Sequence, residues 1–307
     1  MAITFVIFAG LLTAFSNYYM RKSVDAGGSS KSFLMIQLSI AFLVAILLNP
    51  IRTHFYAINL PMLSLGLGAG MLFGFMMLFL GKALENGPPG LTFALLSSAT
   101  VIPGLIMALF FGPSFGFDYK LWHGLGSFIV ILGLFWAGWG VVLIRDRNRW
   151  IFFSLAAVCL HALFLSTMQY RSLAINFSNS PTFLNSHEAQ SQWFMPLIYF
   201  VAALMQAFTF FSAKSKRISS IEWRYGVFGG AANSISTFFL IWATEIAGSL
   251  EQAIIFPIFS VTIILLCNFW GQRFYQENVN WKASQLSVLG LFIATVDWKA
   301  ISSFFFP

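Results

Sequence analysis

The sequence predicts an all-α integral membrane protein whose ten transmembrane helices form two inverted five-helix repeats. Three observations support this: the composition, the succession of apolar runs and the distribution of basic residues. Hydrophobic residues make up 58% of the 307 residues, and Lys, Arg, Asp and Glu together make up 9%. Soluble proteins carry about 25% charged residues, and the mean hydropathy here is +0.80. The composition excludes an ordinary soluble domain and indicates that lipid surrounds most of the chain.

Ten apolar runs follow one another along the chain. A helix needs about 20 apolar residues to cross a bilayer, and barrel strands would be about half as long. Runs of this length satisfy their own backbone polar groups in lipid only as helices. The predicted spans are 3–20, 33–48, 62–80, 91–111, 121–144, 150–170, 193–213, 225–243, 252–270 and 281–296.

Short connections with turn-forming residues separate most of these runs. The segments 25–30, 85–90 and 112–114 contain Gly, Pro, Asn, Asp or Ser, as turns do. Consecutive helices are therefore expected to be neighbours. One longer polar segment, residues 171–192, is predicted as a loop. Taken five by five, the ten spans predict a first five-helix repeat, residues 1–149, and a second, residues 150–307.

The basic residues gather on one side of the predicted spans. Cytoplasmic loops of multi-pass proteins carry an excess of Lys and Arg. Four of the 17 basic residues lie on the other side, namely Arg52, Lys120, Arg171 and Lys299, and the other thirteen follow odd-numbered spans. We therefore expect a multi-pass protein of the cytoplasmic (inner) membrane with both termini and the central loop outside. This pattern also explains the net charge of +7 without nucleic-acid binding.

The two halves share short matches at nearly constant offset. A shift of 160 places Phe79-Leu80, Ala83 and Glu85 on Phe239-Leu240, Ala243 and Glu245. A shift of 157 places 131–134 on 288–291, and a shift of 148 places 12–14 on 160–162. Apolar helices can resemble one another by chance, but matches in the same order favour an inverted repeat, an architecture of many secondary transporters.

These features resemble the drug/metabolite transporter superfamily of the EamA-like, ten-helix type, over nearly the whole chain. The resemblance rests on the glycines of the third span (Gly66, Gly68, Gly70, Gly74), a proline in the fourth and ninth spans (Pro103, Pro257), and the stretch from Ile255 through Gly271 to Gly290. The basic first loop is similar to that of the sugar-uptake branch, which includes rhamnose-type permeases. The resemblance implies a secondary transporter working by alternating access. The external termini and the Phe117-Asp118 pair, where the second half has Glu277-Asn278, depart from the family pattern.

Polar side chains at helical spacing within apolar spans mark a candidate transport cavity. The eighth span carries Asn233 and Thr237 on one face, the first carries Thr13 and Asn17, and the fourth carries Ser97 and Ser98 before Pro103. Pro103 predicts a kink and an exposed carbonyl near Ala99. Alternatively, these small polar residues serve close helix packing.

Four further residues complete the candidate substrate-binding set. His161 lies deep within an apolar run and can titrate near neutral pH, so it serves either as a ligand or as a hydrogen-bonded neighbour of a helix. Trp242 lies near the polar face of the eighth span, and Glu245 and Gln252 lie at span ends. No carboxylate falls at the centre of a predicted span. A neutral or zwitterionic solute is therefore favoured over a cation, which needs a paired anion in lipid.

The predicted function is transport of a small polar metabolite, such as a sugar, an amino acid or a nucleoside-like molecule. A coupling proton and membrane lipid are the further partners considered, and the chain is expected as a monomer or homodimer. An exporter of the same fold and an integral-membrane enzyme acting on a lipid-linked substrate are the alternatives. An enzyme is disfavoured because no nucleophile elbow, phosphate cradle or metal-ligand spacing occurs. No cofactor or metal is predicted, and Cys159 and Cys267 are interpreted as packing residues.

Overall fold

A computed structural model describes residues 1–87, 89–111, 120–138, 146–176, 183–212, 218–247, 249–275 and 280–295. Every regular element among these residues is a helix, which confirms the predicted all-α class. Seven helices are long and apolar enough to cross a membrane. The chain is therefore built as a multi-pass membrane protein.

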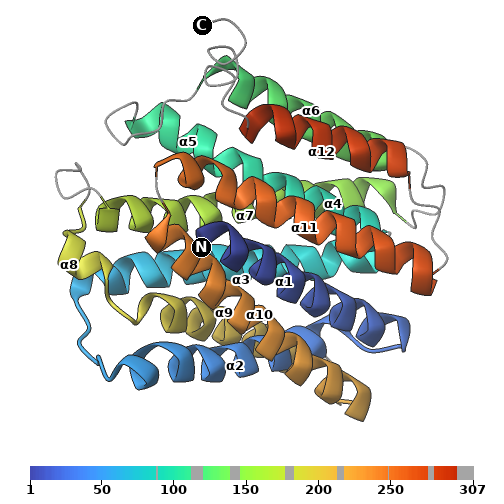
Figure 1. The fold of residues 1–307 in the computed structure, drawn as a ribbon. Helices are drawn as coiled ribbons and strands as arrows, with labels where there is room; N and C mark the ends of the chain where they lie inside the picture. Colours follow the sequence, from blue (N-terminus) through green and yellow to red (C-terminus); the bar gives the residue numbers. More distant parts are fainter. Residues whose placement is uncertain are drawn as a thin grey trace, which may run out of the picture.

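Figure 1 shows the long helices lying side by side, with α6 and α12 together at one edge. In chain order the elements are α1 (Ala2–Asp25), α2 (Ser30–Ile46), the π-helical turn η1 (Leu47–Ile51), α3 (Leu60–Asn86), α4 (Pro89–Ser98), the 3-10 turn η2 (Ala99–Val101), α5 (Ile102–Phe111), α6 (Leu121–Gly138), α7 (Arg147–Asn176), α8 (Ser186–Ala189), α9 (Phe194–Phe211), α10 (Ser220–Ile246), α11 (Ser249–Tyr275) and α12 (Trp281–Thr295).

The predicted fourth span is not one continuous α-helix. It is divided into α4 and α5 by η2, just before Pro103, where the sequence predicts a kink because proline lacks the backbone donor. The expected free carbonyl near Ala99 is wrong, since the Ala99 carbonyl accepts the backbone N–H of Ile102. The carbonyl that accepts side-chain donors belongs to Ser97, two residues earlier.

The predicted loop 171–192 is partly helical. Helix α7 continues through Arg171 to Asn176, and α8 occupies 186–189. The sequence predicts an end at Tyr170 because Arg171 is the first charge after the apolar run. A buried ion pair described below allows Arg171 to remain within the helix, so the span is longer than hydropathy indicates.

Glycines allow close helix packing at two interfaces, called here the glycine seams: α3 with α9, and α10 with α2. Helix α3 packs on α7 and α9, whereas α10 packs on α1 and α2. At Gly70 an added Cβ would lie 2.8 Å from the Cβ of Val201 on α9, and at Gly226 it would lie 2.8 Å from the Cβ of Ile36 on α2. Small residues at such positions allow the backbones of membrane helices to approach.

Candidate functional site

A small cavity of about 70 Å³ lies between α1, α2, α3, α4, η2, α7, α10 and α11. Thr13, His161 and Asn233 each lie near the middle of their own helix. The cavity, called here the central cavity, is therefore at mid-depth in the helix bundle. No Lys, Arg, Asp or Glu is among its lining residues in the described part of the chain.

One wall of the central cavity is polar and comes from α1, α2 and α10. Gln37 donates through Nε2 to the Ser16 hydroxyl at 2.8 Å, and Ser16 donates to the Gly229 carbonyl at 3.1 Å. Thr13 shares a 2.6 Å hydrogen bond with Ser236. These bonds join three helices and fix the orientation of the polar wall.

Two buried amide atoms at this wall have no hydrogen-bond partner among the described residues. They are Oε1 of Gln37 and Nδ2 of Asn233, on side chains that are 3% and 8% exposed. A buried polar atom without a partner costs about 1–3 kcal/mol. Because both residues line the central cavity, a solute or water bound there would be placed to pair with this acceptor and this donor.

His161 projects into the cavity with a defined tautomer. Its Nδ1 lies 3.1 Å from the Leu96 carbonyl oxygen on α4. Because a carbonyl only accepts hydrogen bonds, Nδ1 carries the proton in this contact. In the neutral ring Nε2 is then an acceptor, available to a donor in the cavity.

Tyr199 of α9 supports the polar wall from behind. Its hydroxyl lies 3.2 Å from the Asn233 carbonyl and 2.7 Å from Oγ1 of Thr237. The single hydroxyl proton is donated to the carbonyl, so Thr237 donates to Tyr199. Sequence reasoning missed Tyr199 because one tyrosine in an apolar run carries no spacing signal.

The break in the fourth span supplies the cavity's edge. Ser97 lines the cavity, and its carbonyl accepts the hydroxyls of Thr100 at 2.9 Å and Ser260 at 2.7 Å. Ser98 is not part of the lining, and its hydroxyl donates to the Leu95 carbonyl within the same helix at 2.6 Å.

The opposite wall of the central cavity is apolar. It contains Phe, Met, Leu and Ile side chains of α3, α7 and α11, among them Phe73, Met76, Phe164 and Phe259. Phe73 and Phe164 pack with ring centroids 4.9 Å apart. The cavity therefore offers both hydrogen-bonding groups and thioether and aromatic surface, with His161 next to Phe164 on α7.

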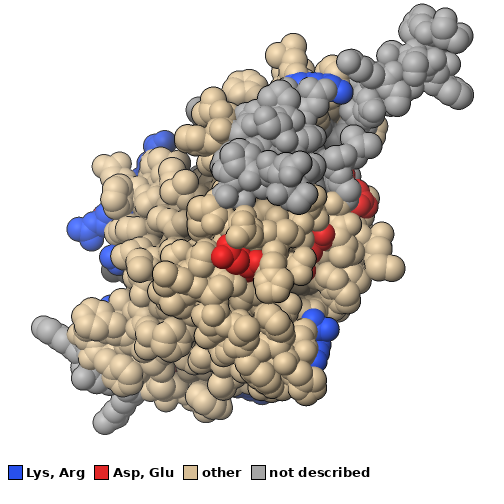
Figure 2. All heavy atoms as spheres, turned by 90° about the vertical axis from the view of Figure 1, so that its left-hand side faces the viewer, with Lys and Arg blue, Asp and Glu red and all other residues tan. Residues whose placement is uncertain are grey.

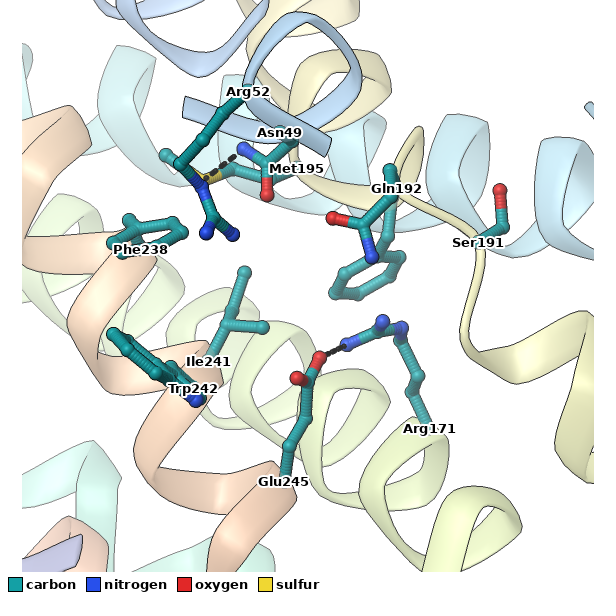
Figure 3. Close-up of a pocket in the computed structure, with 11 residues that line it drawn as sticks. Asn49, Arg52, Arg171, Ser191, Gln192, Met195, Phe238, Ile241, Trp242 and Glu245 are labelled. Atoms are coloured by element: carbon teal, nitrogen blue, oxygen red, sulfur yellow. Dashed lines mark hydrogen bonds and ion pairs between the residues drawn. The ribbon is translucent and has the colours of Figure 1, made fainter. Parts of the chain in front are cut away.

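A second pocket, of about 280 Å³, opens where α2, α7 and α10 end. We call it the end pocket, and Figure 3 shows its lining. Arg171 donates from Nη1 to Oε1 of Glu245 at 2.6 Å, which joins α7 to α10. Figure 2 shows the face at this end of the helices, where charged side chains are few and separate.

The structure brings six of the ten predicted site residues to the central cavity. These are Thr13, Asn17, Ser97, His161, Asn233 and Thr237. Trp242 and Glu245 line the end pocket instead, and Ser98 lines neither. The side chain of Gln252 lies outside the described residues.

Two cations of the end pocket, Arg52 and Arg171, were missed as site residues. Both were assigned to loops because they follow an apolar run. The signal that could have identified Arg171 is Glu245, a lone acid at the end of a span that needs a buried partner in lipid.

No protein-family model and no curated protein matches this chain. A solved structure described as "Crystal structure of protein" is similar in fold, with a TM-score of 0.67 and 16% sequence identity over 98% of each chain. At this identity the likeness concerns the fold alone.

Proposed function

We propose that this protein is a secondary transporter that moves a small polar metabolite, neutral or zwitterionic, across the cytoplasmic membrane by alternating access. The observation that carries the proposal is the central cavity. It lies at mid-depth, it has no charged lining among the described residues, and it leaves a donor on Asn233 and an acceptor on Gln37 unpartnered. Secondary transporters bind solute at this depth, between their repeats.

The proposal includes ten spans in two inverted halves. Besides the seven long helices, the α4–η2–α5 segment, α6 and α12 would provide the other three spans. The contacts between α6 and α12 support the inversion. A Cβ at Gly133 would lie 2.8 Å from the Ala283 carbonyl, and one at Gly290 would lie 2.7 Å from the Val130 backbone nitrogen. The later residue of α6 therefore lies beside the earlier residue of α12, so the two helices are antiparallel. A twofold axis in the membrane plane requires this of two equivalent helices.

The glycine seams also support an inverted repeat, in which each contact recurs when the first and second halves are exchanged. Gly66 and Gly70 of α3 face Leu197 and Val201 of α9. A shift of 160 carries these glycines onto Gly226 and Gly230 of α10, which face Ile36 and Ile40 of α2. Contacts made by the first half with the second therefore recur with the halves exchanged.

Aromatic pairs at opposite ends of the bundle follow the exchange as well. Phe5 of α1 lies 5.4 Å from Phe239 of α10, measured between ring centroids. Phe153 of α7 lies 6.0 Å from Phe79 of α3. The shifts of 148 and 160 that relate the two pairs are those seen in the sequence.

The size of the central cavity is consistent with a transport cycle. Pockets for metabolites commonly measure about 300–1,000 Å³, whereas the central cavity measures about 70 Å³. A solute would therefore enter only after the helices separate. Rocking of the two halves about their interface would open the cavity to each side in turn.

Membership of the drug/metabolite transporter superfamily remains a prediction from the sequence.

A ligand screen tests the proposal. Purified protein in detergent is melted with a panel of sugars, amino acids and nucleosides, because a ligand of the folded state raises the melting temperature by mass action. Radiolabelled forms of the stabilising compounds are then followed into proteoliposomes, with an imposed pH gradient as one arm. We expect saturable stabilisation and saturable uptake without chemical change of the solute. Conversion of the solute to a product would favour the enzyme alternative.

A further inference from the structure

The end pocket holds an unbalanced cation at the edge of an apolar bundle. Its charged lining residues are Arg52, Arg171 and Glu245, and Arg171 and Glu245 form an ion pair with each other. Among the described residues, no carboxylate lies within ion-pair distance of Arg52. The charged lining residues therefore sum to +1, and because Arg52 is exposed to solvent, this charge is open to an anion from outside the chain.

The backbone around Arg52 holds its guanidinium in the pocket. The π-helical turn η1, which contains Pro50, ends directly before Arg52, and π-helical turns are frequent at functional sites. Nε of Arg52 donates to the Leu48 carbonyl at 2.7 Å, and Cζ lies 5.2 Å above the centroid of Phe238. With Nε engaged and the plane stacked, the two Nη groups remain for a ligand.

Arg171 approaches the same space from the other side, as Figure 3 shows. Its side chain is 5% exposed, and its Nε is buried without a partner among the described residues. Cζ stacks 5.0 Å above the Phe194 centroid. A buried guanidinium with an open N–H is a strong donor for an oxyanion.

From this geometry we infer that the end pocket binds the carboxylate of a small organic solute, with Arg52 as the main cation and Arg171 as a second donor. A single surplus charge matches a monoanionic group, and Trp242, which lines the pocket and is 38% exposed, offers aromatic surface to an apolar body. At about 280 Å³ the end pocket is four times the size of the central cavity. Resting on the proposed function, the inference narrows the transported solute to a carboxylate-bearing zwitterion rather than a sugar or nucleoside.

The test compares 3-phenylpropionate with its amide, 3-phenylpropanamide, which has the same shape and no charge. Binding to the purified full-length protein is measured by calorimetry and thermal shift in detergent, so that the result does not depend on transport. We expect the carboxylate to bind and stabilise the protein, and the amide to bind about 10- to 100-fold more weakly, as loss of charged hydrogen bonds predicts. Equal binding of the two probes, or equal stabilisation by inorganic sulfate, would overturn the inference.

Three variants locate the binding. Arg52→Gln is expected to weaken binding of the carboxylate about 10- to 100-fold. Arg52→Lys is expected to weaken this binding less, since lysine keeps the charge but loses the planar fork. Arg149→Gln removes the same charge from an exposed arginine at the other end of the bundle and is expected to leave binding unchanged. Undiminished binding in Arg52→Gln contradicts the site. That result would overturn the carboxylate site alone, because uptake of an uncharged solute through the central cavity does not depend on Arg52.

Discussion

At the scale of single residues, the central cavity presents atoms whose donor and acceptor roles are settled by their neighbours. Nδ1 of His161 is committed to the Leu96 carbonyl, whereas Nδ2 of Asn233 and Oε1 of Gln37 have no partner in the described chain. Six of the ten candidates predicted from the sequence line this cavity, because polar residues in apolar spans are costly unless they face a polar interior. The sequence does not predict which atom of each side chain lacks a hydrogen-bond partner, since the partners come from helices that are distant in the sequence.

Two substitutions separate the two ring nitrogens of His161. His161→Asn keeps an amide near the position of Nδ1 and so retains the bond to Leu96, but it loses the acceptor at Nε2. His161→Gln reaches the position of Nε2 and loses the bond to Leu96. We expect His161→Asn to lose uptake while keeping its melting temperature, and His161→Gln to retain more uptake with stability lower by about 1 kcal/mol. The reverse order in proteoliposome uptake would remove His161 from solute contact.

Asn233→Leu replaces the open amide by an apolar group of similar size. We expect solute affinity to fall about 10-fold or more, while the free energy of unfolding stays constant or rises by about 1 kcal/mol, because an unpartnered buried donor is removed. Uptake kinetics and thermal unfolding measure the two effects. The matched control is Ser234→Ala, whose hydroxyl faces α2 and donates to the Ala41 carbonyl at 2.8 Å; it should lower stability and leave affinity unchanged. Loss of affinity in the control alone would contradict the assignment.

At the scale of the helices, prediction from sequence succeeds where a span is uniformly apolar. It is less accurate at ends and breaks. Helix α7 runs six residues past the predicted end at Tyr170, to Asn176, because Glu245 neutralises Arg171 across the bundle. The kink before Pro103 was predictable from the proline ring, but the hydroxyl of Ser260 that satisfies the Ser97 carbonyl comes from α11 and could not be assigned in advance.

The glycine seam between α3 and α9 gives a matched pair of substitutions. Gly70→Ala places a Cβ 2.8 Å from Val201 and 3.0 Å from the Ile198 carbonyl, whereas at Gly68 nothing lies within 4 Å. We expect Gly70→Ala to destabilise the protein by about 1–3 kcal/mol through overpacking and Gly68→Ala to have little effect. Thermal unfolding in detergent measures both, and equal melting temperatures would show that the helices do not meet at Gly70.

At the scale of the whole molecule, the shifts found in the sequence recur as contacts between helices. The shift of 160 that relates Glu85 to Glu245 also relates the glycines of the two seams. The sequence comparison could not separate this pattern from chance, because apolar helices share many residues. The contacts add information because an inverted repeat would require each residue pair to recur with both partners exchanged, as the glycine contacts of α3 with α9 and of α10 with α2 do.

Orientation in the membrane is testable with a thiol reagent that does not cross lipid. In a chain with Cys159→Ala and Cys267→Ala, we expect Tyr56→Cys to react in intact cells and Lys31→Cys only after permeabilisation. Both positions are exposed. They lie at opposite ends of α2 and its π-helical turn, and the basic loops are expected in the cytoplasm. The opposite labelling would reverse the proposed topology.

Counterflow in proteoliposomes tests the account most directly. Vesicles containing the purified protein are loaded with an unlabelled solute identified by the thermal screen, and entry of its labelled form is followed. A carrier that exposes one mid-membrane site to each side in turn predicts saturable entry accelerated by internal solute, and loss of this acceleration in Asn233→Leu. Entry that does not saturate, or that is indifferent to internal solute and to the Asn233 substitution, would contradict transport through the central cavity.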